Sequence, residues 1–440
     1  MATLESFFDS EKLTTEKARS VTKSFLKSDI QYSIMSPILP FDVIALIIDI
    51  VGENKDTDLL KELALVSHSL HQICIKHLFA NVELHDAVPN YHFVSSKKGF
   101  VQLLKSSPHL IKYIRKLTYE AGHNNDDHLL SPILSNFLPK ISRLNCLAIK
   151  ASNFRWNELD SSLTSALIHL MSLPTMNHID LSYIVNFPLS SLTSSVNLLR
   201  LDIWCLTHFE YFDYHGEDNF FKTVQSEMMP RIREFHTSNS YLPTMKLLNA
   251  EGQDGRPVFN FMDLRQLSVS FNSNSIPSEE KRTLQCLLEK AKLLERLRLS
   301  VDIGMNLVGV FSTSAHTLKV LDLAVSLYHY GFPLLPGLCE ELEAMAGHNT
   351  LESLSFEVRV NARHMTLDSI GSTIQKVESV LVKPGWSALR QVSFKLPVKL
   401  WGGRGESAEF TEALQSLPDK YLSHLPKLET VAFNYSAYAF

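Results

Sequence analysis

The sequence predicts an α/β chain in which an N-terminal module of three helices is followed by an irregular leucine-rich-repeat solenoid. Leucine is over-represented, at 67 of the 440 residues. A short apolar pattern returns from residue 107 onward, and the segments between its occurrences have the periodicity of amphipathic helices. A strand followed by one helix cannot bury its own apolar face, so repeated units of this kind stack on one another.

The composition divides the chain into four segments. Residues 1–36 are polar, and we expect them to form a mobile N-terminal arm. Residues 37–85 are very apolar and are expected to form the compact helical module. Residues 86–106 are expected to be a linker or first cap, and residues 107–440 the repeat region.

The helical module begins in the segment 40–51, where Pro40 suits the start of a helix. At 100° per residue, Asp42, Ala45 and Asp49 share one narrow face, and apolar residues cover an arc of about 220°. A surface helix needs an apolar stripe of only about 100°. The surplus is therefore expected to be buried against another surface.

Two further helices and a strand complete the module. The segment 59–66 is amphipathic, Ser67 suits the N-cap of a helix that runs to residue 78, and the segment 79–84 suggests a short strand. Three short helices make a poor independent core, and an exposed apolar patch of this extent usually marks a protein interface. The alternative is a helical cap on the solenoid, which would show a broad polar outer face.

The repeat region contains eleven copies of the pattern apolar-x-x-apolar-x-apolar. They are Ile114/Leu117/Tyr119, Leu144/Leu147/Ile149, Met176/Ile179/Leu181, Val196/Leu199/Leu201, Ile232/Phe235/Thr237, Leu264/Leu267/Val269, Leu294/Leu297/Leu299, Leu318/Leu321/Leu323, Leu351/Leu354/Phe356, Leu389/Val392/Phe394 and Leu428/Val431/Phe433. Their central positions are between 20 residues (Ile179 to Leu199) and 39 residues (Val392 to Val431) apart. Such intervals fit one strand and one return element per unit. A set of ordinary βα units in another α/β fold is the alternative.

The return segments have the pattern of helices. Apolar residues at i, i+3, i+4 and i+7 mark one face of the segment 284–291. Ser278 is the expected N-cap of this helix, with Glu279 and Glu280 in its first turn. The segments 163–171, 338–345 and 370–381 show a similar pattern, so each unit is expected to pair a strand with a helix.

Three motifs stand in the helical module. They are Leu39-Pro40-x-x-x-Ile44-x-x-x-Ile48, Leu63-x-Leu65-Val66-Ser67-x-x-Leu70 and His77-Leu78-Phe79-x-x-Val82-x-Leu84. Together they resemble an F-box, of the type followed by irregular leucine-rich repeats that is common in fungal proteomes. The resemblance covers residues 37–85 closely and the remainder only as architecture. It implies binding to the Skp-type adaptor of a cullin ubiquitin ligase through Leu39, Pro40, Ile44, Ile47, Val66, Ser67 and Leu70.

The strands of the repeat region are expected to present one extended face, because residues between the buried ones point outward. The charged residues on that face are Asp180, Arg200, Asp202, Arg298, Asp322, Glu357 and Lys395. Mixed charges suit the recognition of a protein segment, where they set specificity more than affinity. The alternative for each residue is a merely solvated position.

Charge and cysteine content restrict the partners and the compartment. The chain has 42 Lys and Arg against 47 Asp and Glu, so it lacks the basic surplus of a general nucleic-acid binder. Five widely spaced cysteines suggest neither a disulfide framework nor a zinc site, and they indicate reduced thiols in the cytoplasm or nucleus. No signal peptide and no membrane span are predicted.

The sequence offers little for catalysis. Residues that could ligate a metal are His123, Asp126, Asp127 and His128, but the stretch 122–128 fits a solvated loop better. The acidic and aromatic stretch 210–218 is either a partner contact or a solvent-facing insertion. The glycine-rich stretch 402–405 lacks the Lys-Ser/Thr of a phosphate cradle. We therefore expect no enzyme, no cofactor and no metal site.

With the resemblance, these observations lead us to expect a non-catalytic adaptor. Residues 37–85 would dock the Skp-type subunit, and through it a cullin, while residues 107–440 hold a target protein. The mechanism is effective concentration of the target near a ubiquitin-conjugating enzyme. The alternative is a leucine-rich-repeat interaction scaffold outside ubiquitin ligases, whose helices bind another partner or a second copy of the chain.

Overall fold

The computed structural model describes residues 40–85, 95–121, 126–207, 229–271, 277–302, 305–327, 336–361, 367–399, 412–422, 424–428 and 430–439. They form a mixed α/β structure with a thirteen-stranded sheet. The chain divides into two compact units, one drawn from Met1–Val82 and Ser95–Arg115 and the other from Glu83–Val94 and Lys116–Phe440. The expected N-terminal arm, residues 1–36, lies outside the described residues.

The first unit is helical. Its described elements are α3 (Phe41–Glu53), α4 (Thr57–Val66), α5 (His68–Leu78), α6 (Lys97–Ser106) and the 3-10 helix η1 (Pro108–Tyr113). The three helices expected between residues 40 and 78 are therefore confirmed. The short strand expected near residue 82 is also confirmed, as β1 (Asn81–His85), and a two-residue strand, β2 (Ser95–Ser96), follows it.

A small core joins α3, α4 and α5. Ile48, Leu60, Ala64 and Cys74 are buried at its centre. Ser67 caps α5 as expected, since its Oγ accepts a hydrogen bond from the Leu70 N–H at 3.3 Å. Each of these helices thus contributes one face to a shared interior, and its other faces stay outside that core.

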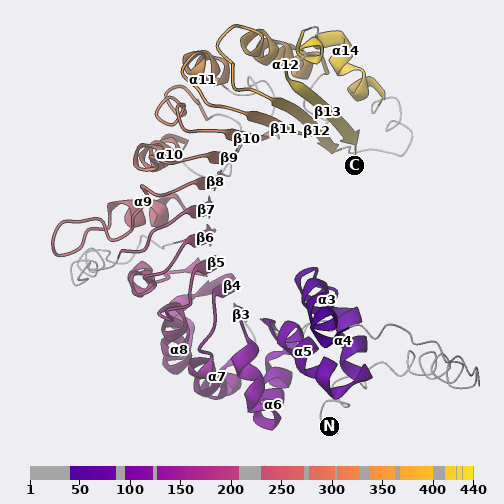
Figure 1. Ribbon diagram of the computed structural model, residues 1–440. Helices are drawn as coiled ribbons and strands as arrows, with labels where there is room; N and C mark the ends of the chain where they lie inside the picture. Colours follow the sequence, from indigo (N-terminus) through magenta and orange to yellow (C-terminus); the bar gives the residue numbers. More distant parts are fainter. Residues whose placement is uncertain are drawn as a thin grey trace, which may run out of the picture. The chain divides into compact units, whose positions relative to one another are not determined.

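The second unit contains eleven parallel strands in sequence order (Figure 1). They are β3 (Lys116–Ala121), β4 (Cys146–Arg155), β5 (His178–Val185), β6 (Arg200–Trp204), β7 (Glu234–Ser238), β8 (Gln266–Ser270), β9 (Arg296–Asp302), β10 (Val320–Leu327), β11 (Ser353–Asn361), β12 (Gln391–Lys399) and β13 (Ala432–Ala439). Each strand pairs in parallel with the strand that follows it along the chain.

Helices connect many of these strands and lie along one side of the sheet (Figure 1). The α-helices are α7 (Asp126–Phe137), α8 (Ser161–Met171), α9 (Tyr241–Asn249), α10 (Pro277–Lys290), α11 (Leu338–Met345), α12 (Leu367–Leu381) and α14 (Leu417–Tyr421). The 3-10 helices are η2 (Leu138–Lys140), η3 (Trp156–Glu158), η4 (Leu189–Ser194) and η7 (Leu425–Lys427).

The four expected return helices are confirmed as α8, α10, α11 and α12. One cap was placed wrongly. Ser278 lies in the first turn of α10, because the helix begins one residue earlier at Pro277, a residue that favours the first helical position. The acidic first turn of Glu279 and Glu280 is confirmed. Asp126 begins α7, so the stretch 122–128 is not entirely a loop as the sequence suggested.

The apolar pattern forms continuous rows through the sheet. Leu117, Leu147, Ile179, Leu201 and Phe235 occupy one register row, and each is fully buried. The row continues through Leu267, Leu297, Leu321, Leu354, Val392 and Phe433. These side chains form the core between strands and helices, so the opposite face of the sheet is the polar one. We call this second surface the polar face.

Two of the eleven expected repeats are shifted by two residues. In β6 the buried set is Leu198, Leu201 and Ile203, whereas Leu199 is 38% exposed. In β13, Phe433 pairs with Val392, the position that the sequence pattern gave to Val431. A shift of two keeps strand residues on the same face, so the apolar pattern alone does not distinguish the two registers.

Candidate functional site

Helix α3 is apolar on two adjoining faces. One face contributes Ile48, which is 1% exposed, and also Ile44 and Val51 to the core of the first unit. On the other face Val43, Leu46, Ile47 and Ile50 are exposed, with Leu46 at 59%. Their spacing of i, i+3, i+4 and i+7 places them in one line along the helix. We call these four residues the apolar stripe.

Helix α4 adds exposed apolar side chains of its own. Leu59, Leu65 and Val66 are exposed, and Val66 reaches 70%. Leu65 and Val66 lie in the last turn of α4, directly before the Ser67 cap of α5. Large apolar side chains this exposed on two neighbouring helices are the usual sign of a protein-binding surface.

Local contacts hold α3 in place. The His77 Nε2 of α5 lies 2.7 Å from Asp49 Oδ1 of α3. Gly52 lies beside the same ring, and a Cβ there would come within 2.3 Å of His77 Nδ1. Only glycine leaves room for this contact, which fixes the direction in which the apolar stripe faces.

The expected adaptor contacts fall into three groups. Leu39 lies outside the described residues. Pro40, Ile47, Val66 and Ser67 are exposed. Ile44 and Leu70 are half-buried, because both pack against the helical core. The sequence reading missed Val43, Leu46 and Ile50, although their helical spacing with Ile47 was visible.

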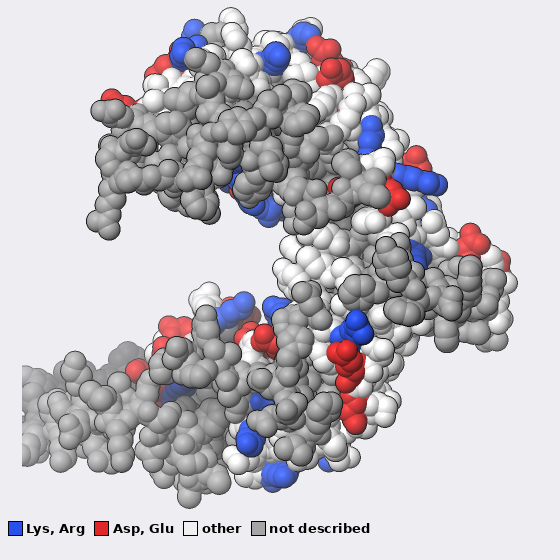
Figure 2. All heavy atoms as spheres, turned by 180° about the vertical axis from the view of Figure 1, so that it is seen from behind, with Lys and Arg blue, Asp and Glu red and all other residues white. Residues whose placement is uncertain are grey.

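The expected target contacts all lie on the polar face. Asp180, Asp202, Arg298 and Asp322 belong to one register row. Arg200 lies two positions earlier along its strand, and Glu357 and Lys395 lie two positions later along theirs. Arg298 and Lys395 are exposed, and Asp180, Arg200, Asp322 and Glu357 are half-buried. In the rear view, Lys and Arg side chains are interspersed with Asp and Glu (Figure 2). The second unit therefore carries mixed charge.

Asp202 is the exception, at 5% exposed. Its carboxylate lies 2.9 Å from His178 Nε2, 3.0 Å from Arg200 Nη2 and 3.5 Å from His236 Nδ1. Arg200 Nη1 also reaches Glu234 at 3.4 Å, and Cys146 Sγ lies 3.3 Å from His178 Nδ1. Asp202 thus has little surface left for a partner, and instead orients the groups around it. We call Cys146, His178, Arg200, Asp202, Glu234 and His236 the Asp202 cluster.

The cluster shifts the pKa values of its members. Burial alone would lower the pKa of His178, but hydrogen bonds to Asp202 and Cys146 outweigh it and raise the pKa to about 9. Burial would raise the pKa of Asp202, but hydrogen bonds from His178 and Arg200 lower it. Burial lowers the pKa of His236 and raises that of the nearby Asp180. At neutral pH, His178 is therefore charged between an acid and a thiol.

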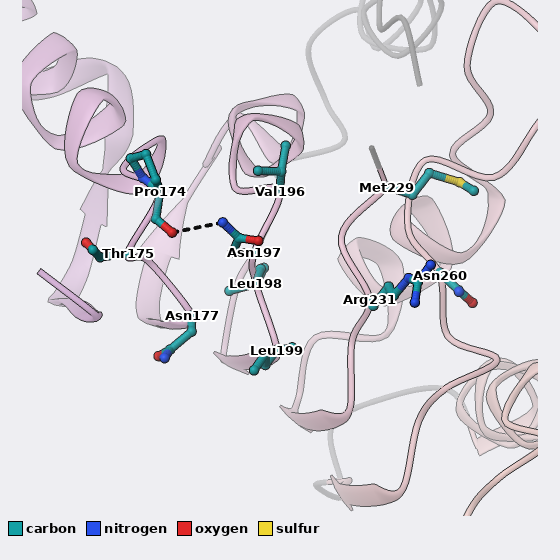
Figure 3. A pocket seen from close by; sticks show the side chains of 10 residues that line it. All are labelled: Pro174, Thr175, Asn177, Val196, Asn197, Leu198, Leu199, Met229, Arg231 and Asn260. Atoms are coloured by element: carbon teal, nitrogen blue, oxygen red, sulfur yellow. Dashed lines mark hydrogen bonds between the residues drawn. The ribbon is translucent and has the colours of Figure 1, made fainter. Parts of the chain in front are cut away.

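A cavity of about 560 Å³ opens where β5, β6 and β7 begin (Figure 3). Its lining is Pro174, Thr175, Asn177, Val196, Asn197, Leu198, Leu199, Met229, Arg231 and Asn260. The Asn197 amide donates a hydrogen bond to the Pro174 carbonyl at 2.8 Å. These ten residues include no carboxylate, imidazole or thiol.

Several sequence candidates lie outside the described residues. They are His123, the side chains of Asp126, Asp127 and His128, the stretch 210–218 and the glycines at 402–405. Within the described ranges, no group of three or more His, Cys, Asp or Glu side chains is placed to hold a metal ion. Among the same residues, no helix has both the length and the apolar character that crossing a bilayer requires.

A scan against models of known protein families finds no match for this chain, and a search of curated proteins finds none either.

Proposed function

We propose that the chain is a non-catalytic substrate-recognition subunit of a Skp–cullin–F-box ubiquitin ligase. In this proposal α3, α4 and α5 form the F-box module, and the second unit is an irregular leucine-rich-repeat solenoid that binds the target. The observation that carries the proposal is the apolar stripe on a helix whose adjoining apolar face is already buried in its own core.

The size of the stripe suits a docking surface. Fully burying one large aliphatic side chain contributes about 1.5–3 kcal/mol, so covering four half-exposed ones contributes roughly 3–6 kcal/mol. The exposed side chains of α4 add to this sum. Binding must also offset the loss of translational and rotational freedom. A few apolar side chains that become well buried in the partner can supply most of the binding energy that this requires.

The second unit suits target binding because its polar face is long and carries both signs of charge. Such a face discriminates between partners through complementary and repelling charges. Neither role requires bond chemistry by this chain. The assembly brings the target's lysines near a ubiquitin-conjugating enzyme that carries ubiquitin. The rate of ubiquitin transfer then depends on the effective concentration of the target at that enzyme.

The test is binding of the purified full chain to a Skp-type adaptor, measured by calorimetry. We expect Leu46→Asp combined with Ile47→Asp to weaken binding by about 100-fold or more, because both anchors would carry buried charge. Gln72→Asp on the exposed surface of α5 is the matched control and should bind like the wild type. Circular dichroism checks that all variants remain folded.

Two results would overturn the proposal. One is a wild type that fails to bind the adaptor, and the other is an α3 double variant that binds as well as the control. A wild-type dimer in solution that the double variant separates would instead support the interaction scaffold built on a second copy of the chain.

A further inference from the structure

Cys146, His178 and Asp202 form a continuous line across three neighbouring strands. Cys146 begins β4, His178 begins β5, and the two are register partners. The imidazole spans the gap, with Nδ1 at 3.3 Å from Cys146 Sγ and Nε2 at 2.9 Å from Asp202 Oδ2. Both ring nitrogens are therefore engaged, and the ring orientation is fixed by the acid on its far side.

A positively charged imidazole faces the sulfur. With a pKa of about 9, His178 carries two N–H groups at neutral pH, so Nδ1–H donates to Sγ. On the other side, Cys146 pairs in register with the exposed Lys116 of β3. Positive charge beside a thiol stabilises the thiolate, which is the nucleophilic form.

The other cysteines lack this arrangement. Cys74 is completely buried in the helical core, and burial raises its pKa. Burial and the nearby Glu340 and Glu343 raise the pKa of Cys339. Cys205 and Cys286 are half-exposed, so a small reagent can reach both. Their rates therefore show how fast an accessible cysteine of this chain reacts without the His178 contact. Cys146 itself is 8% exposed and lies on the polar face of the sheet, opposite the helices.

We propose that Cys146 is a reactive thiol that exchanges with small disulfides, with His178 as its positioning residue and Asp202 fixing the imidazole. The thiol proton leaves to solvent, and the thiolate sulfur of Cys146 attacks one sulfur of the disulfide. That S–S bond breaks as the new one forms, and the second sulfur departs as a thiolate. A free thiol reverses the modification. The site stands apart from the proposed adaptor function, since the exchange requires no partner protein.

The test uses the full chain and an aromatic disulfide whose released thiolate absorbs visible light, followed by mass mapping of the five cysteines. At pH 7, we expect Cys146 to react about tenfold faster or more than Cys205 and Cys286, despite its lower exposure. Cys146→Ser removes the fast phase. Equal rates for the three thiols, or a fast phase that survives Cys146→Ser, would refute the proposal.

Two imidazole variants separate positioning from general structural effects. His178→Gln should slow the Cys146 reaction by about tenfold or more, because the positive charge beside the sulfur is lost. His236→Gln is the matched control, since His236 also faces Asp202 but no contact joins it to Cys146. The control should keep the wild-type rate. Equal rates in both variants contradict the role of His178.

Discussion

At the scale of single residues, Asp202 shows why a charged side chain can be buried on a sheet face. Its carboxylate faces three cationic or titratable groups, namely His178, Arg200 and His236. These contacts lower its pKa, so its stabilising contribution is present above the ordinary Asp value and is lost as pH falls through the lowered one. Removing the partners would leave a buried charge without compensation.

His178 makes the free energy of unfolding depend on pH. Its pKa rises from 6.5 to about 9 in the folded chain, so its contribution is complete below pH 6.5 and is lost as pH rises through 9. The shift corresponds to on the order of 3 kcal/mol. Urea unfolding at pH 6.5 and 9.5 should show this loss in the wild type and a much smaller one in His178→Gln. A variant that keeps the full difference contradicts the assignment.

At the scale of elements, α3 combines two apolar faces with different roles. Its core face holds the small helical unit together, and its apolar stripe stays exposed. The sequence predicted the excess of apolar surface on this helix. It could not tell which face was free, because the choice depends on where α4 and α5 pack. The F-box resemblance placed Ile44 among the adaptor contacts, and in the structure Ile44 packs partly against the core.

The two faces of α3 should respond differently to truncation. Ile48→Ala leaves a cavity among Leu60, Ala64 and Cys74, so we expect the first unit to lose about 2–5 kcal/mol in free energy of unfolding. Leu46→Ala removes an exposed side chain and should change that quantity by no more than about 0.5 kcal/mol. Chemical denaturation followed by circular dichroism measures both. Equal losses in free energy of unfolding for the two variants would mean that the Leu46 side chain is packed rather than exposed.

The same dependence on neighbours explains why the Asp202 cluster was missed. A single sequence shows Cys146, His178 and Asp202 at wide separations, and only strand register brings them together. Cys146 and His178 each precede the central residue of their repeat, so the pattern already aligned them. The two-residue error at Leu199 misaligned the next strand, and therefore hid the position of Asp202 beside His178.

At the scale of the whole molecule, the repeated alternation predicted the sheet of the second unit well. Nine of the eleven patterns fall in the observed register, because each set of apolar residues must face the same core. The order of the strands was also predictable, because repeat units stack on the units next to them in the sequence. Several of the candidate functional residues lie outside the described ranges. For these residues the sequence pattern predicts no neighbours.

Stacking also predicts how far a destabilising substitution acts within the second unit. Leu321 of β10 lies between Leu297 of β9 and Leu354 of β11. Because stability is a sum of nearest-neighbour terms, we expect Leu321→Ala to speed amide hydrogen exchange mainly in β9, β10 and β11. Exchange in β4 should change little, as mass spectrometry of peptides from each strand can show. A uniform increase would indicate that the unit unfolds all at once.

Pairing in strict chain order has a consequence for how such a protein can diversify. Corresponding strand positions are 22 residues apart from Ile179 to Leu201 and 41 residues apart from Val392 to Phe433. A connection can lengthen or shorten without breaking any other strand pair, since no third strand crosses it. New surface loops, or whole additional units, can therefore be acquired piecemeal during evolution while the older strands keep their hydrogen bonds.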